Sequence, residues 1–171
     1  ISIAMCAMLA SCGGVKNEVS DTEQPTLIDT MSLEEKVGQI LFVRCVDDEQ
    51  TDDLMSIKPG GILMFGRDFE GLTKDEVKEK IQSYQDKSDI PLIIGADEEG
   101  GTVVRVSSNP NLAPEKFKSP QEIYNEGGMD AVVENATEKS ELLLSLGVNM
   151  NLAPVADVST NPSDYMYDRS L

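Results

Sequence analysis

Short apolar runs alternate with helix-like segments along most of this chain, and this alternation restricts the possible folds more than any other feature. Four runs read as strands: residues 40–46, 62–65 and 92–96, and a fourth within 148–158. Strands that are apolar along nearly their whole length, rather than at alternate positions, are typical of a parallel sheet covered on both faces. The sequence therefore predicts an α/β protein with about four βα units.

The segments between these runs carry signals for the start and end of helices. Ser32 with Glu35, and Thr73 with Glu76, have the spacing of a capping box at a helix N-terminus. Gly147 fits the left-handed residue that ends a third helix. The residues expected to face the core are Leu33, Val37 and Ile40 in the first helix, Val77, Ile81 and Tyr84 in the second, and Val132, Val133, Ala136, Leu143 and Leu144 in the third, from about Asp130.

Three adjacent acids, Asp97, Glu98 and Glu99, follow the third predicted strand and are followed in turn by Gly100 and Gly101. The binding site of a parallel α/β fold lies at the carboxyl ends of its strands, and glycines let the backbone turn sharply there. The acids therefore stand where such a fold places its site. An alternative is that they begin a helix, whose positive N-terminal end favours acids. Other polar residues expected at the same edge are Arg67, Asp68 and Asp157.

The charge balance narrows the range of partners. The chain has 14 basic and 31 acidic residues, a formal net charge of −17 and no histidine. A surface of this sign repels nucleic acid and anionic lipid headgroups, so we expect neither as a partner. The acidic run from Asp47 to Asp53 lacks the glycine and the final glutamate of an EF-hand loop. We expect no metal and no cofactor.

The N-terminus has the features of an export signal. Residues 1–12 are uncharged, too short to span a bilayer, and end in Leu-Ala-Ser-Cys. This ending resembles the lipobox of bacterial lipoproteins, which implies that Cys12 is lipidated and becomes the first mature residue. Residues 13–27 then read as a flexible tether. Because Cys6 would leave with the signal, Cys45 has no partner for a disulfide and is expected to be a small buried residue.

Four ordered motifs between residues 27 and 171 resemble the N-terminal catalytic domain of glycoside hydrolase family 3, in its β-N-acetylhexosaminidase branch. They are MSLEEKVGQILFV, KPGGILMFGR, IGADEEGGTVVR and LGVNMNLAPVADVSTNP with the later DRSL. The third resembles the Asp-x-Glu-Gly-Gly-x-Val-x-Arg signature of the family. The resemblance implies a TIM-type (β/α)8 barrel, of which residues 28–171 would form the N-terminal half.

The resemblance also implies roles for single residues. Asp97 is expected to bind hydroxyl groups of a terminal N-acetylglucosamine, since a carboxylate accepts charge-assisted hydrogen bonds. Arg105 is expected to hold the acids of the site and to contact the sugar, and Arg169 is expected to contact it as well. Ordinary ion pairing with acids is the alternative for both arginines. Many members of the family have glutamine in place of Glu98. If Glu98 points away from the site, as its alternation with Asp97 and Glu99 suggests, the difference is harmless; if it points inward, its charge alters the preference of the pocket.

The catalytic groups of this branch, an aspartate nucleophile and a histidine acid/base, correspond to positions beyond Leu171. We therefore expect a chain truncated at both ends, containing part of a sugar pocket and no catalytic residue. The expected protein is an exported retaining β-N-acetylhexosaminidase, anchored through Cys12 on the extracytoplasmic side of a bacterial membrane and acting on peptidoglycan-derived or related glycans. The alternatives are a β-glucosidase of the same family and a non-catalytic sugar-binding lipoprotein.

Overall fold

The structure is a computed structural model that describes residues 25–44 and 48–170. The chain divides into two compact units, Ile1–Thr30 and Met31–Leu171. The described part of the first unit holds the short helix α1 (Leu27–Thr30), which Asp29 caps by accepting hydrogen bonds from the amide and hydroxyl of Thr26 at 2.9 and 2.6 Å. The predicted signal segment, its Cys12, most of the predicted tether and Cys45 lie outside the described residues.

The second unit contains a four-stranded parallel sheet in the order β1-β2-β3-β4. Its strands are β1 (Phe42–Val43), β2 (Gly61–Leu63), β3 (Ile93–Ala96) and β4 (Met150–Asn151). In the register of the sheet, Ile62 lies between Val43 and Ile94, and Gly95 pairs with Met150. The predicted α/β class with a parallel sheet is confirmed, although each strand is shorter than its apolar run.

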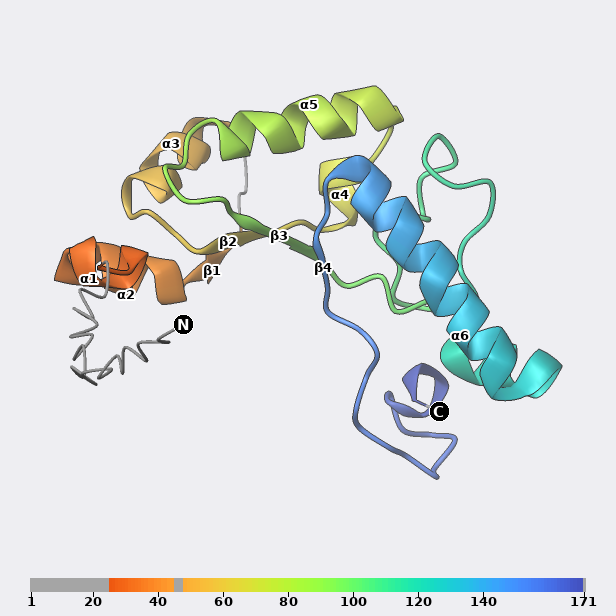
Figure 1. Cartoon of the computed structure of the whole chain (residues 1–171). Coiled ribbons are helices and arrows are strands. Elements are labelled where there is room, and N and C mark those ends of the chain that lie inside the picture. The colour runs from red at the N-terminus through yellow and green to blue at the C-terminus, as the bar shows by residue number, and fades with distance from the viewer. Residues whose placement is uncertain (1–24, 45–47, 171) are drawn as a thin grey trace, which may run out of the picture. The chain divides into compact units, whose positions relative to one another are not determined.

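Helices connect these strands and also precede the first and follow the last of them, as Figure 1 shows. They are α2 (Leu33–Ile40), α3 (Asp48–Ser56), α4 (Gly66–Phe69), α5 (Lys74–Gln85), α6 (Pro120–Leu146) and the short 3-10 helix η1 (Tyr167–Arg169). Both predicted capping boxes are present, at Ser32 with Glu35 and at Thr73 with Glu76, and Gly147 ends α6 with a φ of 93°. None of the helices in these described ranges is long and apolar enough to cross a membrane.

The core lies between the sheet and helices α5 and α6, which also contact each other. Ile62 in β2, Met64 directly after it, and Ile94 and Ala96 in β3 are at most 1% exposed because they point toward these helices. The predicted core face of α5 is confirmed. Its buried residues are Val77, Ile81 and Tyr84.

The opposite face of the sheet is more open among the described residues, so the expected cover on both faces is not observed there. Phe42, Ile93 and Met150 on this face are 37%, 42% and 36% exposed. A Cβ at Gly61 or Gly95 would come within 2.6 or 2.5 Å of the Phe42 ring, so the two glycines make room for that ring. In a closed barrel, the corresponding face of the sheet points into the interior.

Two predicted helix faces differ from the structure. The helix expected from about residue 130 begins at Pro120 instead, where Ser119 and Glu122 form a third capping box, and it is kinked at Gly128 with a φ of 68°. On α6 the expected Leu143 is buried, but Val133 and Leu144 are 61% and 63% exposed and Ala136 is exposed. The predicted apolar face of α2 is also exposed. Its residues Leu33, Val37 and Ile40 are 72%, 51% and 81% exposed.

Candidate functional site

The three acids end β3 at the carboxyl edge of the sheet, and no helix follows them directly. Residues 97–119 form a loop, and the next helix begins at Pro120. The alternative in which the acids begin a helix is therefore wrong. Gly100 and Gly101 turn the chain with φ of 103° and 65°, as predicted, and a Cβ on Gly100 would lie 2.1 Å from the Lys118 carbonyl oxygen. Only glycine fits at this close approach of two backbones.

Glu98 is fully buried and holds the loop together from inside. One carboxylate oxygen accepts hydrogen bonds from the amides of Arg105 and Val106 at 2.6 and 2.7 Å, and the other accepts them from the Ser107 amide at 3.3 Å and from the Ser107 hydroxyl. The amide and carbonyl of Glu98 are held by the side chain of Asn151 on β4, at 3.0 and 3.1 Å. Glu98 thus points into the loop and away from the carboxylates of Asp97 and Glu99, as the alternation of side chains predicted. From this position its hydrogen bonds fix the conformation of the loop.

Asp97 and Arg105 form a bidentate ion pair. Nε and Nη2 of Arg105 donate to the two carboxylate oxygens at 2.7 and 2.5 Å, and both side chains are about one quarter exposed (22% for Asp97 and 26% for Arg105). The hydrogen bond to Asp97 raises the pKa of Arg105, so the arginine stays charged. A carboxylate has about four lone-pair positions. The pair therefore fixes the orientation of Asp97 and leaves part of its accepting capacity facing solvent.

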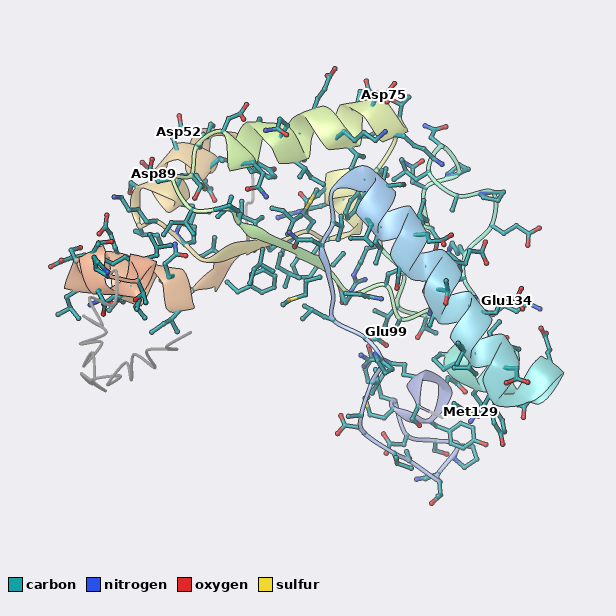
Figure 2. All side chains as sticks on the ribbon, viewed as in Figure 1. Asp52, Asp75, Asp89, Glu99, Met129 and Glu134 are labelled. Atoms are coloured by element: carbon teal, nitrogen blue, oxygen red, sulfur yellow. The ribbon has the colours of Figure 1, made fainter. Side chains whose placement is uncertain are left out.

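Glu99 forms the second bidentate pair, with Arg169. Nε and Nη2 of Arg169 donate to the Glu99 carboxylate at 2.9 and 2.7 Å, although the two residues are 70 positions apart. The Arg169 guanidinium also lies 4.9 Å from the centre of the Tyr165 ring. Bonding to Glu99 raises the pKa of Arg169. The pair ties the C-terminal segment to the end of β3, and Figure 2 shows Glu99 beside that segment.

Lys139 on α6 contacts the backbone of Glu99 and was not predicted from the sequence as part of this site. Its ammonium donates to the Glu99 carbonyl oxygen at 2.7 Å and lies 5.7 Å from the centre of the Phe117 ring, while the residue is only 7% exposed. Burial lowers the pKa of Lys139, and the charges of Glu98 and Glu99 oppose that shift. The sequence did hold a signal, because Lys139 lies one helical turn before the apolar Leu143 on the same face.

A pocket of about 300 Å³ is lined in part by Glu99 and Lys139. Its lining combines polar groups of Glu99, Lys139 and Asn151 with apolar residues of α6 such as Val132 and Met129, the latter labelled in Figure 2. The pocket therefore lies between α6 and the segment that follows β4.

Three other residues expected at this edge are not members of these pairs. Asp68 is buried and accepts a hydrogen bond from the Phe65 amide at 2.7 Å, so it supports the start of α4. Arg67 and Asp157 are exposed. Within residues 25–44 and 48–170, no group of three or more histidine, cysteine, aspartate and glutamate side chains gathers as metal ligands would.

The fold and site together define a class of protein. A parallel sheet of four βα units, with acid–arginine pairs at the carboxyl end of its third strand, is the arrangement of the first half of a (β/α) barrel whose site lies at that edge. The family model "Glycosyl hydrolase family 3 N terminal domain" matches residues 32–171, and the chain belongs to that family. The family recognised from the four motifs is confirmed.

Known relatives agree with this assignment and with its hexosaminidase branch. The chain is 31% identical over 108 residues to β-hexosaminidase A of Pseudoalteromonas piscicida, a match that covers 61% of this chain and 18% of the relative. It is 27% identical over 141 residues to the β-hexosaminidase LpqI of Mycobacterium tuberculosis, covering 82% of this chain and 35% of the relative. The chain thus spans about a third or less of the length of these relatives.

A solved structure supports the fold. The crystal structure of a glycosyl hydrolase of family 3 from Mycobacterium smegmatis superposes with a TM-score of 0.67 at 24% identity, covering 82% of this chain and 42% of that one. The fold predicted for the chain, part of a family 3 barrel, is confirmed by this similarity.

Proposed function

We propose that this chain is part of an exported, lipid-anchored β-N-acetylhexosaminidase that hydrolyses terminal β-linked N-acetylglucosamine residues of peptidoglycan-derived or related glycans. In this proposal the chain provides one side of the sugar pocket. The histidine acid/base and the aspartate nucleophile that the family resemblance implies belong to sequence beyond Leu171, and Cys12 carries the lipid.

The observation that carries the proposal is that the Asp97 carboxylate is held in place by Arg105 and is still partly exposed. Its carboxylate stands at the carboxyl end of β3 and is held by both ends of the Arg105 fork, yet its side chain is 22% exposed. Two hydroxyl groups on neighbouring carbons of a sugar ring can donate to the lone pairs that Arg105 does not use. Asp97 would thereby fix the ring, and Arg105 would keep the carboxylate charged and oriented. These bonds would matter most as the ring distorts toward the transition state.

In the proposal, Arg169 contacts the sugar with the N–H donors that Glu99 does not use. Its guanidinium is oriented by Glu99 and lies against the Tyr165 ring, and its side chain is 17% exposed. Ion pairing with an acid, the alternative raised for both arginines, is what each of them does here. The pairing does not compete with sugar binding, since it orients a guanidinium that has five N–H donors and uses two of them on the carboxylate.

The test uses the protein at its full gene-encoded length with two chromogenic substrates, a β-N-acetylglucosaminide and a β-glucoside. We expect preference for the first, and we expect Asp97→Asn to lower kcat/KM for it about tenfold to a hundredfold. A lost charge-assisted hydrogen bond costs about 1.5–3 kcal/mol, and each ~1.4 kcal/mol is a factor of ten in rate.

The matched control is Asp89→Asn, in a residue whose side chain is 92% exposed and which Figure 2 labels away from Glu99. This variant should keep wild-type kinetics. If Asp97→Asn stays within twofold of wild type, Asp97 does not bind the sugar. Preference for the β-glucoside would favour the β-glucosidase alternative, and binding of N-acetylglucosamine without hydrolysis would favour the sugar-binding lipoprotein.

A further inference from the structure

Charged side chains of both signs gather around the turn that follows β3. The acids are Asp97, Glu98 and Glu99, and the bases are Arg105, Arg169 and Lys139. Each arginine is committed to one acid, in the bidentate pairs with Asp97 and with Glu99. Glu98 and Lys139 belong to neither pair, and both are buried.

Glu98 and Lys139 have no direct ion pair. Among residues 25–44 and 48–170, no opposite charge lies within 4.0 Å of either side chain, although Glu98 is fully buried and Lys139 is only 7% exposed. A buried charge is costly unless another charge compensates it. The amides and the hydroxyl that bond to Glu98 stabilise its carboxylate but carry no net charge. Compensation for Glu98 must therefore come from a charge further away.

Lys139 lies close enough to Glu98 to provide that charge. Its ammonium donates to the carbonyl oxygen of the next residue, Glu99, at 2.7 Å, and a Cβ on Gly100 would lie 3.5 Å from its nitrogen. Burial lowers the pKa of Lys139, and the charge of Glu98 opposes this shift more strongly than that of Glu99. The two buried charges thus stabilise each other across the turn, because the protein interior screens them little.

Both acid–arginine pairs depend on the residues that Lys139 acts upon. The Glu98 carboxylate accepts from the Arg105 amide at 2.6 Å, so it fixes the main chain at the arginine of the first pair. The Glu99 carbonyl accepts from Lys139, and the Glu99 carboxylate orients the guanidinium of Arg169 in the second pair. A single side chain on α6 therefore acts on both pairs through the main chain of the turn.

We propose that Lys139 is a positioning residue, which balances the buried charge of Glu98 and holds the main chain at Glu99, so that both acid–arginine pairs keep their geometry. Its effect on sugar binding rests on the proposed function, since Lys139 would act on the sugar only through Asp97 and Arg169. Its effect on the loop does not rest on that function.

Charge balance predicts a rescue that packing alone does not. In the protein at its full gene-encoded length, Lys139→Met keeps the apolar stem of the side chain and leaves the Glu98 charge uncompensated. The amides of Arg105 and Val106 should then exchange with solvent about a hundredfold faster. Adding Glu98→Gln to Lys139→Met removes the uncompensated charge and should slow this exchange about tenfold, although Glu98→Gln alone speeds it.

The matched control is Glu138→Gln, which neutralises an acid at an exposed position of α6 next to Lys139. Combined with Lys139→Met, it should leave the exchange as fast as in Lys139→Met alone. The charge balance would be refuted if Lys139→Met kept wild-type exchange, or if Glu98→Gln added its own acceleration to that of Lys139→Met. Equal rescue by Glu98→Gln and Glu138→Gln would also refute it, because any lost acid would then suffice.

The same variants with the chromogenic β-N-acetylglucosaminide test the link to the sugar. We expect Lys139→Met to lower kcat/KM about tenfold, and Glu98→Gln to restore part of that loss. Hydrogen exchange needs no turnover, so it decides on the charge balance even if the wild type hydrolyses neither chromogenic substrate; in that case only the proposed function fails. An active Lys139→Met enzyme with unchanged kcat/KM would overturn the positioning role.

Discussion

Replacing Glu98 with alanine should release the turn that follows β3, and the size of the effect can be worked out from its hydrogen bonds. The carboxylate accepts from the amides of Arg105, Val106 and Ser107 and from the Ser107 hydroxyl, inside a site that is fully buried. The hydroxyl can rotate to another acceptor, but the three amides cannot. Since a stranded buried donor costs about 1–3 kcal/mol, even the lower value predicts a local loss of ~3 kcal/mol.

Glutamine at the same position should cost far less. Its amide oxygen can accept the two short bonds from Arg105 and Val106, and its amide nitrogen can donate to the Ser107 oxygen. The losses are the charge and the longest of the backbone bonds, that from the Ser107 amide at 3.3 Å. We expect a cost of about 1 kcal/mol. A cost of this size is compatible with the same loop conformation in Glu98→Gln.

Amide hydrogen exchange measures both costs in the loop itself. The amides of Arg105 and Val106 should exchange more than a hundredfold faster in Glu98→Ala and less than about tenfold faster in Glu98→Gln, because each ~1.4 kcal/mol is a factor of ten in an opening equilibrium. Glu79→Gln, at an exposed position of α5, is the control and should leave both amides unchanged. Wild-type protection in Glu98→Ala, or equal losses in the two Glu98 variants, would refute the reasoning.

Three further predictions address the lipid anchor, the buried lysine and the open sheet. Metabolic labelling with a fatty-acid probe should mark the wild type and not Cys12→Ala, since two or more acyl chains would anchor the protein; equal labelling would contradict the proposed anchor. The unfolding free energy of the wild type relative to Lys139→Met should rise as the pH rises toward 10.5, because burial lowers the pKa of Lys139 and the unfolded chain then binds more protons in that window; a flat difference would argue against it. The 171-residue chain expressed alone should bind an apolar dye and aggregate, because β1 and β4 are edge strands among the described residues and Phe42 and Ile93 are exposed; a sharp cooperative melt of a monomer would show the opposite.

Features set by residues close together in the chain could be predicted from the sequence. The capping boxes at Ser32 and Thr73 need only a partner three residues away, and the stop at Gly147 needs only a residue that tolerates positive φ. The capping box at Ser119 with Glu122, and the Pro120 that follows Ser119, are equally local signals, and they mark an earlier start of α6 than the apolar pattern from about Asp130 predicts. The apolar runs determined the parallel sheet, and the polar residues after β3 marked the edge that carries the acid–arginine pairs.

Side-chain partners from distant parts of the chain were decided only by the tertiary structure. Three adjacent acids look alike in the sequence, yet Asp97 pairs with Arg105, Glu98 binds the amides of its own loop, and Glu99 pairs with Arg169, 70 residues away. Successive side chains of an extended segment point in opposite directions, and which direction meets an arginine, a backbone or a buried lysine depends on segments that only folding brings there. The sequence by itself thus determined the class of fold and the edge of the sheet at which the three acids stand, whereas the folded chain decided what each carboxylate contacts.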